Sequence, residues 1–560
     1  MKQELVNRSI FLGVALMLVL LGGLTACGPS AIKPTVFNTT QPTIVAPSYE
    51  VDVLVPGSYF HGIHGLTFDS QDNLYAGSVI GQTIYKIVTK GGKVEISEYI
   101  GSPEGLADDL EFGPDGQLYW TSYISGKVRT KAGDKVKALA EGLPGVNSIA
   151  FKQDGRLFVG EVFLGDSLYE IDIKGEKAPR VIARGIGGLN GFDFGPDGKL
   201  YGPLWFKGQV VRIDVDTGKM ETVAEGFKIP AAVNFDSKGN FFVVDTNAGE
   251  VVQVDIKTGE KKVIANVLPS IDNLALNSKD ELFISNMSTS GIYRVDVKTG
   301  KVDTIVEGKL TCPGGIDAAG ETIYLADIFA LRQIDGNTGE VTTLERSHAD
   351  HIEYPFAASV KGDKVFLTSW FVGTVQEFDL KTKKITRTFY GFVAPYEVLP
   401  LDDGSLLVAE LGKGRIVRVS GAEGEKRDVV TEGLVSPIGL ALADKNNVYV
   451  TEAIVGRVTT VNLTTGEKKV VTSGLAVPEG IAVQANGKIL VVETGLRQLV
   501  EIDPKSGAKT PIVKDLAIGL ISIPETANPF GAMNDVAVSD SGAIYVTGDV
   551  ENVLYKITRK

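Results

Sequence analysis

From about residue 50 onward, the chain repeats short segments in which hydrophobic and polar residues alternate, separated by turns that contain glycine. One complete unit is VPEGIAVQANGKILVVETGLRQLVEIDPKSGAKTPIV, residues 477–513, and it divides into four short strands. Asp-Gly, Asn-Gly and Thr-Gly pairs in the turns favour antiparallel hairpins. The pattern therefore predicts an all-β fold built from four-stranded β-meanders, and it excludes a helical repeat.

The repeat has a period of about 41 residues, which lies in the range of β-propeller blades. The first strand of each unit is expected to begin near twelve positions: 64, 108, 147, 190, 231, 272, 314, 356, 396, 438, 479 and 534. Propellers usually carry about four to eight blades. We therefore predict two tandem six-bladed β-propellers rather than one ring of twelve blades or a seven-plus-five division.

The two ends of the repeat region indicate how the rings close. The last unit stops at VLYKITRK and lacks a fourth strand, whereas VDVLVPG, residues 51–57, has the pattern of a fourth strand without a unit before it. We expect VDVLVPG to complete the blade that starts at Asp272, which would leave TGKVDTIVEG, residues 299–308, to complete the final blade. The predicted domains are then residues 50–298 and residues 299–560.

The N-terminal segment has the features of a bacterial lipoprotein signal. The apolar run of residues 10–21 is too short for a membrane span, and Leu24-Thr25-Ala26-Cys27 has the form of a lipobox. An ordinary signal peptide that happens to contain a cysteine is the alternative. We expect residues 1–26 to be removed, Cys27 to be lipidated, and residues 27–49 to form a tether. The body would then lie outside the cytoplasm, attached to the cell envelope through its N-terminal lipid.

Composition narrows the range of partners. The net charge is −13 and the basic residues are not clustered, so a nucleic-acid partner is not expected. The second cysteine is Cys312, and once Cys27 is lipidated no intrachain disulfide can form. We interpret Cys312 as a small buried apolar residue. Stability must therefore come from packing, for which a chain of this length has sufficient core.

The first residue of each inner strand is expected to face the mouth of its propeller channel. In the first ring these residues are His64, Asp108, Asn147, Asn190, Ala231 and Asp272. In the second ring they are Gly314, Phe356, Tyr396, Ile438, Glu479 and Asn534. The first channel mouth is thus polar and contains two acids, whereas the second is mostly apolar or small. This contrast predicts a functional site in the first propeller.

Carboxylates and amide carbonyls that meet on one axis repel each other unless a cation joins them. Oxygen ligands of this kind suit Ca²⁺. We therefore interpret Asp272 as a calcium ligand and Asn273 as its neighbour in the site. The alternative is that Asp and Asn at these positions only cap strand ends and turns.

Four short segments carry a family resemblance. ADDLEF (107–112), GVNSIAF (145–151), GGLNGFDF (187–194) and SIDNLAL (270–276) resemble the channel-lining strands of calcium-dependent six-bladed lactonases, the gluconolactonase/regucalcin family and the paraoxonases. The resemblance implies that calcium is held by Asp108, Asn147, Asn190 and Asp272, with Asn273 as a further candidate. It also implies that His64, in a His-Gly pair similar to that of paraoxonases, assists the attack of water. The order of the acid and the histidine along the chain differs from paraoxonases.

These residues suggest a hydrolase for a small-molecule lactone or ester, with His64 as the general base and Asp108 as the substitute base. His61, in the same HGIHG segment, is a further candidate. A propeller lipoprotein that binds a ligand or protein, with structural calcium, is the first alternative, because propellers host many functions. A streptogramin-lyase-like enzyme is the second. The second propeller is a candidate surface for a protein partner, and His348 and His351 are a weak candidate pair for a transition metal.

The lipobox gives a direct prediction. Cys27→Ser should abolish lipidation and release the protein from the membrane fraction, because a single processed cysteine would carry all the acyl chains. Fractionation of cells that express the wild-type and substituted proteins measures this. Substituted protein that stays with the membrane after a high-salt wash would contradict the lipobox interpretation.

Overall fold

The prediction of an all-β propeller fold is confirmed. In a computed structural model of the chain, which describes residues 37–90, 93–522 and 533–560, antiparallel sheets account for nearly all regular structure. The helical elements among these residues are two short 3₁₀ turns, η2 (Leu411–Lys413) and η3 (Thr494–Leu496). No helix in the described part of the chain is long and apolar enough to cross a membrane.

The first ring contains six four-stranded sheets that follow one another in sequence. They are β3–β6 (66–100), β7–β10 (110–140), β11–β14 (146–184), β15–β18 (193–225), β19–β22 (230–266) and β23–β26 (271–306). The inner strands are β3 (Leu66–Phe68), β7 (Leu110–Phe112), β11 (Val146–Phe151), β15 (Asp193–Phe194), β19 (Pro230–Phe235) and β23 (Ile271–Leu276). Each inner strand lies beside the next, and β23 returns to β3, so the ring closes.

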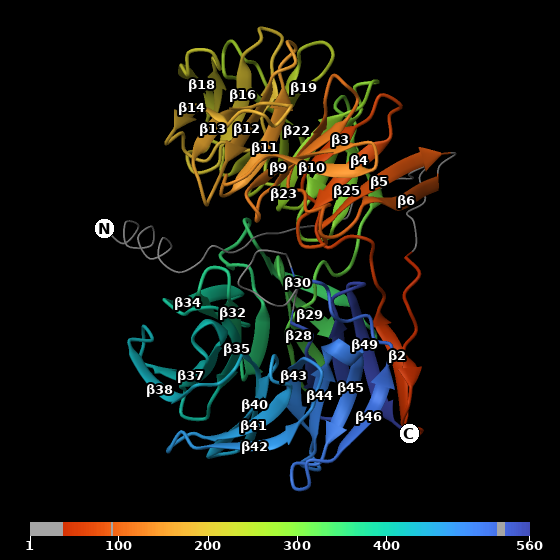
Figure 1. Cartoon of the computed structure of the whole chain (residues 1–560), viewed down its shortest axis with the longest axis vertical. Helices are drawn as coiled ribbons and strands as arrows, with labels where there is room; N and C mark the ends of the chain where they lie inside the picture. The colour runs from red at the N-terminus through yellow and green to blue at the C-terminus, as the bar shows by residue number, and fades with distance from the viewer. Residues whose placement is uncertain (1–36, 91–92, 523–532) are drawn as a thin grey trace.

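The second ring follows the same plan. Its sheets are β27–β30 (316–346), β31–β34 (357–390), β35–β38 (395–432), β39–β42 (437–473), β43–β46 (478–514) and β47–β49 (536–559), the last completed by β2 (Tyr49–Val55). The inner strands are β27 (Ile316–Ala319), β31 (Ala357–Lys361), β35 (Pro395–Pro400), β39 (Pro437–Asp444), β43 (Pro478–Val483) and β47 (Val536–Val538). These strands also form a closed cycle, in which β47 lies beside β27. Figure 1 shows the two rings as two bodies.

The predicted exchange of closing strands is wrong. β2 pairs with β49 (Val553–Arg559), for example Tyr49 with Arg559, and in Figure 1 the red β2 lies beside the dark blue β49. Residues 302–306 form β26, which pairs with β25 (Gly291–Val295) of their own unit. A tight turn explains the local pairing, because Asp296 Oδ1 accepts the backbone N–H groups of Lys298 and Thr299 at 2.9 and 3.0 Å. The boundary therefore falls after β26 and not at residue 298, and β2 belongs to the second propeller.

The predicted tether also needs correction. Residues 1–36, with the signal peptide, Cys27 and most of the tether, lie outside the described residues. Within the remainder, β1 (Thr43–Ile44) pairs with β46 (Lys509–Lys514) and adds a fifth strand to that sheet. Thr40 donates its backbone N–H to Glu551 at 2.8 Å. The chain from about residue 40 is thus part of the second propeller.

Acidic residues at the ends of second strands hold the loops between blades. Glu452 forms an ion pair with Arg457 at 2.7 Å and also accepts the backbone N–H of Val435 at 2.8 Å. Buried Asp327 pairs with Arg332 at 2.8 Å and accepts the backbone N–H of Cys312 at 2.7 Å. These carboxylates satisfy buried loop donors, so they serve the architecture. Cys312 is itself fully buried.

The pairing of β2 with β49 predicts a selective effect of truncation. A chain that begins at Gly57 lacks β2 and leaves the edge of β49 open, so the second propeller should lose about 10 °C or more in unfolding temperature while the first changes little. Differential scanning calorimetry, with a chain that begins at Phe37 as the control, measures the two transitions. An unchanged second transition would contradict this closure.

Candidate functional site

A cavity lies at the channel mouth of the first propeller, where the sequence predicted a site. Its walls include five of the six first-ring positions, namely His64, Asp108, Asn147, Asn190 and Asp272. The sixth, Ala231, is buried in the hydrophobic core that surrounds this mouth. The structure therefore brings together the polar residues that the repeat alignment placed on one axis.

Strand position explains this convergence. Asn147 and Asp272 lie within the first residues of β11 and β23, and His64, Asp108 and Asn190 directly precede β3, β7 and β15. Because inner strands start at the same end of the ring, equivalent residues of different blades meet although they are far apart in sequence.

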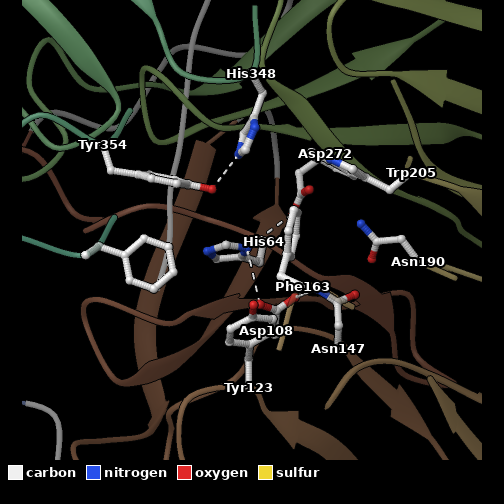
Figure 2. A pocket seen from close by; sticks show the side chains of 11 residues that line it. His64, Asp108, Tyr123, Asn147, Phe163, Asn190, Trp205, Asp272, His348 and Tyr354 are labelled. Carbon is white, nitrogen blue, oxygen red and sulfur yellow. Dashed lines mark hydrogen bonds and ion pairs between the residues drawn. The ribbon is translucent and has the colours of Figure 1, made fainter. Parts of the chain in front are cut away.

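His64 lies between the two acids (Figure 2). Its Nδ1 atom is 3.2 Å from Asp272 Oδ2 and 3.8 Å from Asp108 Oδ2. The other ring nitrogen, Nε2, is buried and has no hydrogen-bond partner within the described residues. A proton on Nδ1 would bind the carboxylates, which leaves Nε2 as a base that faces the cavity.

Burial and charge oppose each other in this cluster. Burial disfavours the imidazolium ion, but the facing Asp108 and Asp272 outweigh it and raise the pKa of His64. Burial raises the pKa of Asp108 to about 7, although the nearby imidazole acts in the opposite direction. The cluster therefore holds protons near neutral pH, as expected of a site for proton transfer.

The two asparagines have different partners. Asn147 donates its side-chain N–H to Asp108 Oδ1 at 2.6 Å, which fixes that carboxylate. Asn190 Oδ1 accepts the backbone N–H of Gly191 at 2.9 Å. Both side chains line the cavity, and each provides an amide oxygen of the kind that calcium binds.

The structure does not bring Asn273 into the cavity. Its Oδ1 accepts the backbone N–H of Leu274 at 2.7 Å, and its Nδ2 donates to Asp109 Oδ1 at 3.0 Å. The register of β23 shifts between Ile271 and Leu274, so Asp272 and Asn273 lie at an irregularity of the strand, and their side chains take different directions. Asp109 is buried, and this burial raises its pKa to about 8. Asn273 thus contacts Asp109 outside the cavity and does not line it.

His61 also lies away from the cavity. Its Nε2 is 2.7 Å from the backbone oxygen of Asp549, a residue of the second propeller, and burial lowers the pKa of His61. Asn552 of the same turn donates to the backbone oxygen of Phe60 at 2.8 Å. The HGIHG segment therefore has two roles, because His61 joins the propellers and His64 faces the site.

The second propeller completes the cavity, which the sequence did not predict. His348, Tyr354 and Phe371 line it from the opposite side. His348 and Tyr354 belong to the loop between β30 (Val341–Arg346) and β31, and the unusual length of this loop was the available sequence signal. His351 is exposed, so the predicted pair of His348 and His351 does not form a joint metal site.

Contacts with the first propeller hold this loop in place. Asn247 Nδ2 donates to the backbone oxygens of His348 and Ala349 at 2.8 and 2.9 Å. Ser270 Oγ donates to the backbone oxygen of Ser347 at 2.7 Å. The loop is thus fixed by side chains from two blades of the first ring.

Aromatic rings surround the loop histidine. The His348 ring lies 4.9 Å from the Trp205 ring, edge to face, and 6.4 Å from the Phe163 ring, nearly parallel. Its Nε2 is 2.9 Å from the hydroxyl oxygen of Tyr354, and burial lowers the pKa of His348 to about 4. Trp205 also lines the cavity, together with Tyr123 and Phe371.

The cavity is small. Its volume is about 20 Å³, enough for one water-sized group. His64 contacts both Asp108 and Asp272 directly, and no three His, Cys, Asp or Glu side chains of the described residues are arranged to hold a metal ion. The donor chemistry of two carboxylates and two amides fits calcium.

The channel mouth of the second propeller has no such cluster in the described residues. The Phe356 and Tyr396 rings lie 4.8 Å apart, and both belong to the hydrophobic core with Ile438. Buried Glu479 accepts the backbone N–H of Asn534 at 2.8 Å and its side-chain N–H at 3.1 Å. This mouth is packed mainly by apolar side chains.

A family model described as a repeat of unknown function, DUF6923, matches residues 125–264, which is less than half of the chain. The search of curated proteins found no match.

Three solved structures illustrate the similarity of fold. An extracellular domain of a one-component system from B. thetaiotaomicron is 13% identical, with a TM-score of 0.34 and coverage of 89% of this chain and 76% of that one. A streptogramin B lyase is 15% identical, with a TM-score of 0.26 and coverage of 59% and 93%. A protein described as a gluconolactonase is 14% identical, with a TM-score of 0.36 and coverage of 48% and 99%. At these scores the similarities carry no functional conclusion.

The buried His348 predicts a dependence of stability on pH. Its pKa falls from 6.5 in the unfolded chain to about 4 in the folded chain, so between these values the unfolded chain binds more protons and stability is lost as the pH falls. When the pH falls from 7 to 5, the free energy of unfolding of His348→Gln should decrease by about 2 kcal/mol less than that of the wild type. Urea denaturation at both pH values measures this, with the exposed His351→Gln as the control. Equal losses in wild type and His348→Gln would contradict the burial of a neutral imidazole.

Proposed function

We propose that this protein is a calcium-dependent hydrolase of lactones or esters, attached to the cell envelope through lipidated Cys27. The observation that carries the proposal is the placement of His64. Its Nδ1 is 3.2 Å from Asp272 Oδ2, while its buried Nε2 is unpartnered within the described residues. An imidazole oriented by a carboxylate, with its second nitrogen free in a cavity, is suited to general-base catalysis.

Each polar residue then has a defined task. Asp272 holds the proton on Nδ1 and stabilises the imidazolium ion that forms when Nε2 takes a proton from water. Asp108 provides a second negative charge, and Asn147 fixes this carboxylate through the 2.6 Å hydrogen bond to Oδ1. The His64 imidazolium can later return its proton to the leaving oxygen of the ester.

Calcium is part of the proposal because of the donor set. Asp108, Asn147, Asn190 and Asp272 would hold the ion, since carboxylates and amide carbonyls in one cavity are typical calcium ligands. When bound, the ion would polarise a carbonyl group as a Lewis acid.

Ligand binding without turnover is the second candidate. The small enclosed volume and the aromatic wall of Tyr123, Phe163, Trp205, Tyr354 and Phe371 favour it, because such walls are common in binding sites. A screen of uncharged lactones and aryl esters with the purified protein separates the two candidates. A protein that only binds its ligand would show saturable binding without hydrolysis.

Calcium dependence can be tested by thermal unfolding. Calcium should raise the unfolding temperature of the wild type, because a cation that binds only the folded chain stabilises it by mass action. Asp272→Ala should remove this increase, whereas Asn534→Ala, at the equivalent position of the second ring, should retain it. Equal calcium stabilisation of wild type and Asp272→Ala would refute the proposed ligand set.

A companion variant separates metal binding from proton transfer. His64→Gln should retain calcium stabilisation but lower the rate of hydrolysis by about 10²-fold or more, because the general base is lost. Hydrolysis at the wild-type rate in His64→Gln would exclude His64 as the base without affecting the test of calcium.

A further inference from the structure

We infer that the two propellers share one active site, in which the substrate carbonyl group lies between His64 of the first propeller and Tyr354 of the second. This inference rests on the proposed hydrolase and assigns a residue of the second propeller to the reaction. Both side chains line the same cavity, and Figure 2 shows the Tyr354 hydroxyl group directed toward the centre of the cluster.

The repeat fixes the backbone at Tyr354. Its φ is 48°, and similar left-handed values of 48°, 51° and 51° occur at Ala394, Ser436 and Val477, which also directly precede a proline near the start of an inner strand. The left-handed conformation of Tyr354 is therefore a regular feature of the second propeller. The Tyr354 side chain lines the cavity from this fixed backbone position.

His348 directs the hydroxyl group. Its Nε2 lies 2.9 Å from the Tyr354 oxygen, and its pKa of about 4 keeps the ring neutral near pH 7. With its proton on Nε2, His348 donates to the Tyr354 oxygen, and the hydroxyl hydrogen is then free for a ligand. Burial also raises the pKa of Tyr354, so the hydroxyl remains protonated. His348 is therefore a positioning residue for Tyr354.

The reaction step balances with these groups. Water adds its oxygen to the carbonyl carbon while His64 Nε2 takes a water proton, and the Tyr354 O–H stabilises the negative charge that develops on the carbonyl oxygen. The bond to the leaving oxygen then breaks, and His64 returns the proton to that oxygen. A fixed hydrogen-bond donor at such an oxygen typically contributes about 10²-fold or more to kcat.

The walls also indicate the substrate class. The aromatic wall of the cavity provides an apolar surface along which the body of the substrate can lie. This wall continues outward from Trp205 to Phe163, which is 39% exposed, and to Phe206, which is 58% exposed. The carboxylates of Asp108 and Asp272 disfavour anions. The site thus fits an uncharged lactone or aryl ester with an apolar ring.

Binding and turnover of one ring system test the inference. Dihydrocoumarin serves as the substrate, and its non-hydrolysable lactam analogue serves as the binding probe in isothermal titration calorimetry with calcium present. Tyr354→Phe removes only the hydroxyl group. It should lower kcat for dihydrocoumarin about 10²-fold with a smaller change in KM, and weaken lactam binding about tenfold. Tyr390→Phe, the same change at a 52% exposed position of the second propeller, should alter neither.

A double-mutant cycle separates a shared contact from a general structural defect. The cycle compares the fold-decrease in kcat of the double variant, His64→Gln with Tyr354→Phe, with those of the two single variants. If His64 and Tyr354 act on one carbonyl group, the decrease in the double variant should be at least tenfold smaller than the product of the two single decreases. If Tyr354 had only a structural role, the decreases in kcat would multiply in the double variant, and Tyr354→Phe would have a lower unfolding temperature than the wild type.

The outcomes are distinguishable. Lactam binding that depends on Tyr354, without hydrolysis by the wild type, would support the shared site and refute the hydrolase. Equal lactam affinity and equal kcat in wild type and Tyr354→Phe would overturn the shared site and leave the hydrolase intact. Failure of the wild type to bind the lactam at millimolar concentration would overturn the inferred substrate class.

Discussion

Closure of each ring is the constraint on which the rest of this structure depends. A blade leaves backbone donors and acceptors exposed at its edge strands, and a propeller is stable when its inner strands meet in a closed cycle. In the first ring, local hairpins provide all four strands of every blade. In the second, β49 would end with an open edge, and β2 covers it although more than 490 residues separate the two strands in sequence.

The site is a consequence of this closure. Inner strands that start around one axis bring Asp108 and Asp272 together in a buried mouth, where two unpaired carboxylates would be costly. The structure reduces this cost through His64, whose Nδ1 lies 3.2 Å from Asp272, and through Asn147, which donates to Asp108 at 2.6 Å. The two acids raise the pKa of His64, and its Nε2 has no hydrogen-bond partner among the residues that the structure describes. The imidazole that offsets the charge of the buried carboxylates is thereby also a group that is capable of proton transfer.

The sequence was informative where the repeat was regular. The alternating pattern predicted the sheets, and alignment of the units placed His64, Asp108, Asn147, Asn190 and Asp272 at one channel mouth. Two features could not be predicted from the sequence. The partner of VDVLVPG depends on which edge remains open in three dimensions, and strand patterns at residues 51–57 and 302–306 are too similar to decide this. The contribution of Tyr354 depends on how the two rings face each other, which no repeat pattern encodes.

Asn273 shows a further limit of position-by-position reasoning. Its neighbour Asp272 faces the cavity, but at the irregularity in β23 Asn273 turns toward Asp109 at 3.0 Å. A resemblance in sequence therefore transfers only those residues whose side chains point into the cavity. His61, which contacts Asp549, differs from His64 in the same way.

The pairing of β2 with β49 makes the first propeller an insertion within the second, between β2 and β27. A nascent chain emerges from its N-terminus, so β2 is synthesised before the first propeller and can find its partner only after β49 has been translated. The first propeller can fold as a unit during this interval, because all of its strands are contiguous. Until β49 emerges, β2 has no partner from its own sheet. Completion of the second propeller is thereby coupled to translation of β49, and a chain terminated before β49 would contain one closed ring and one open one.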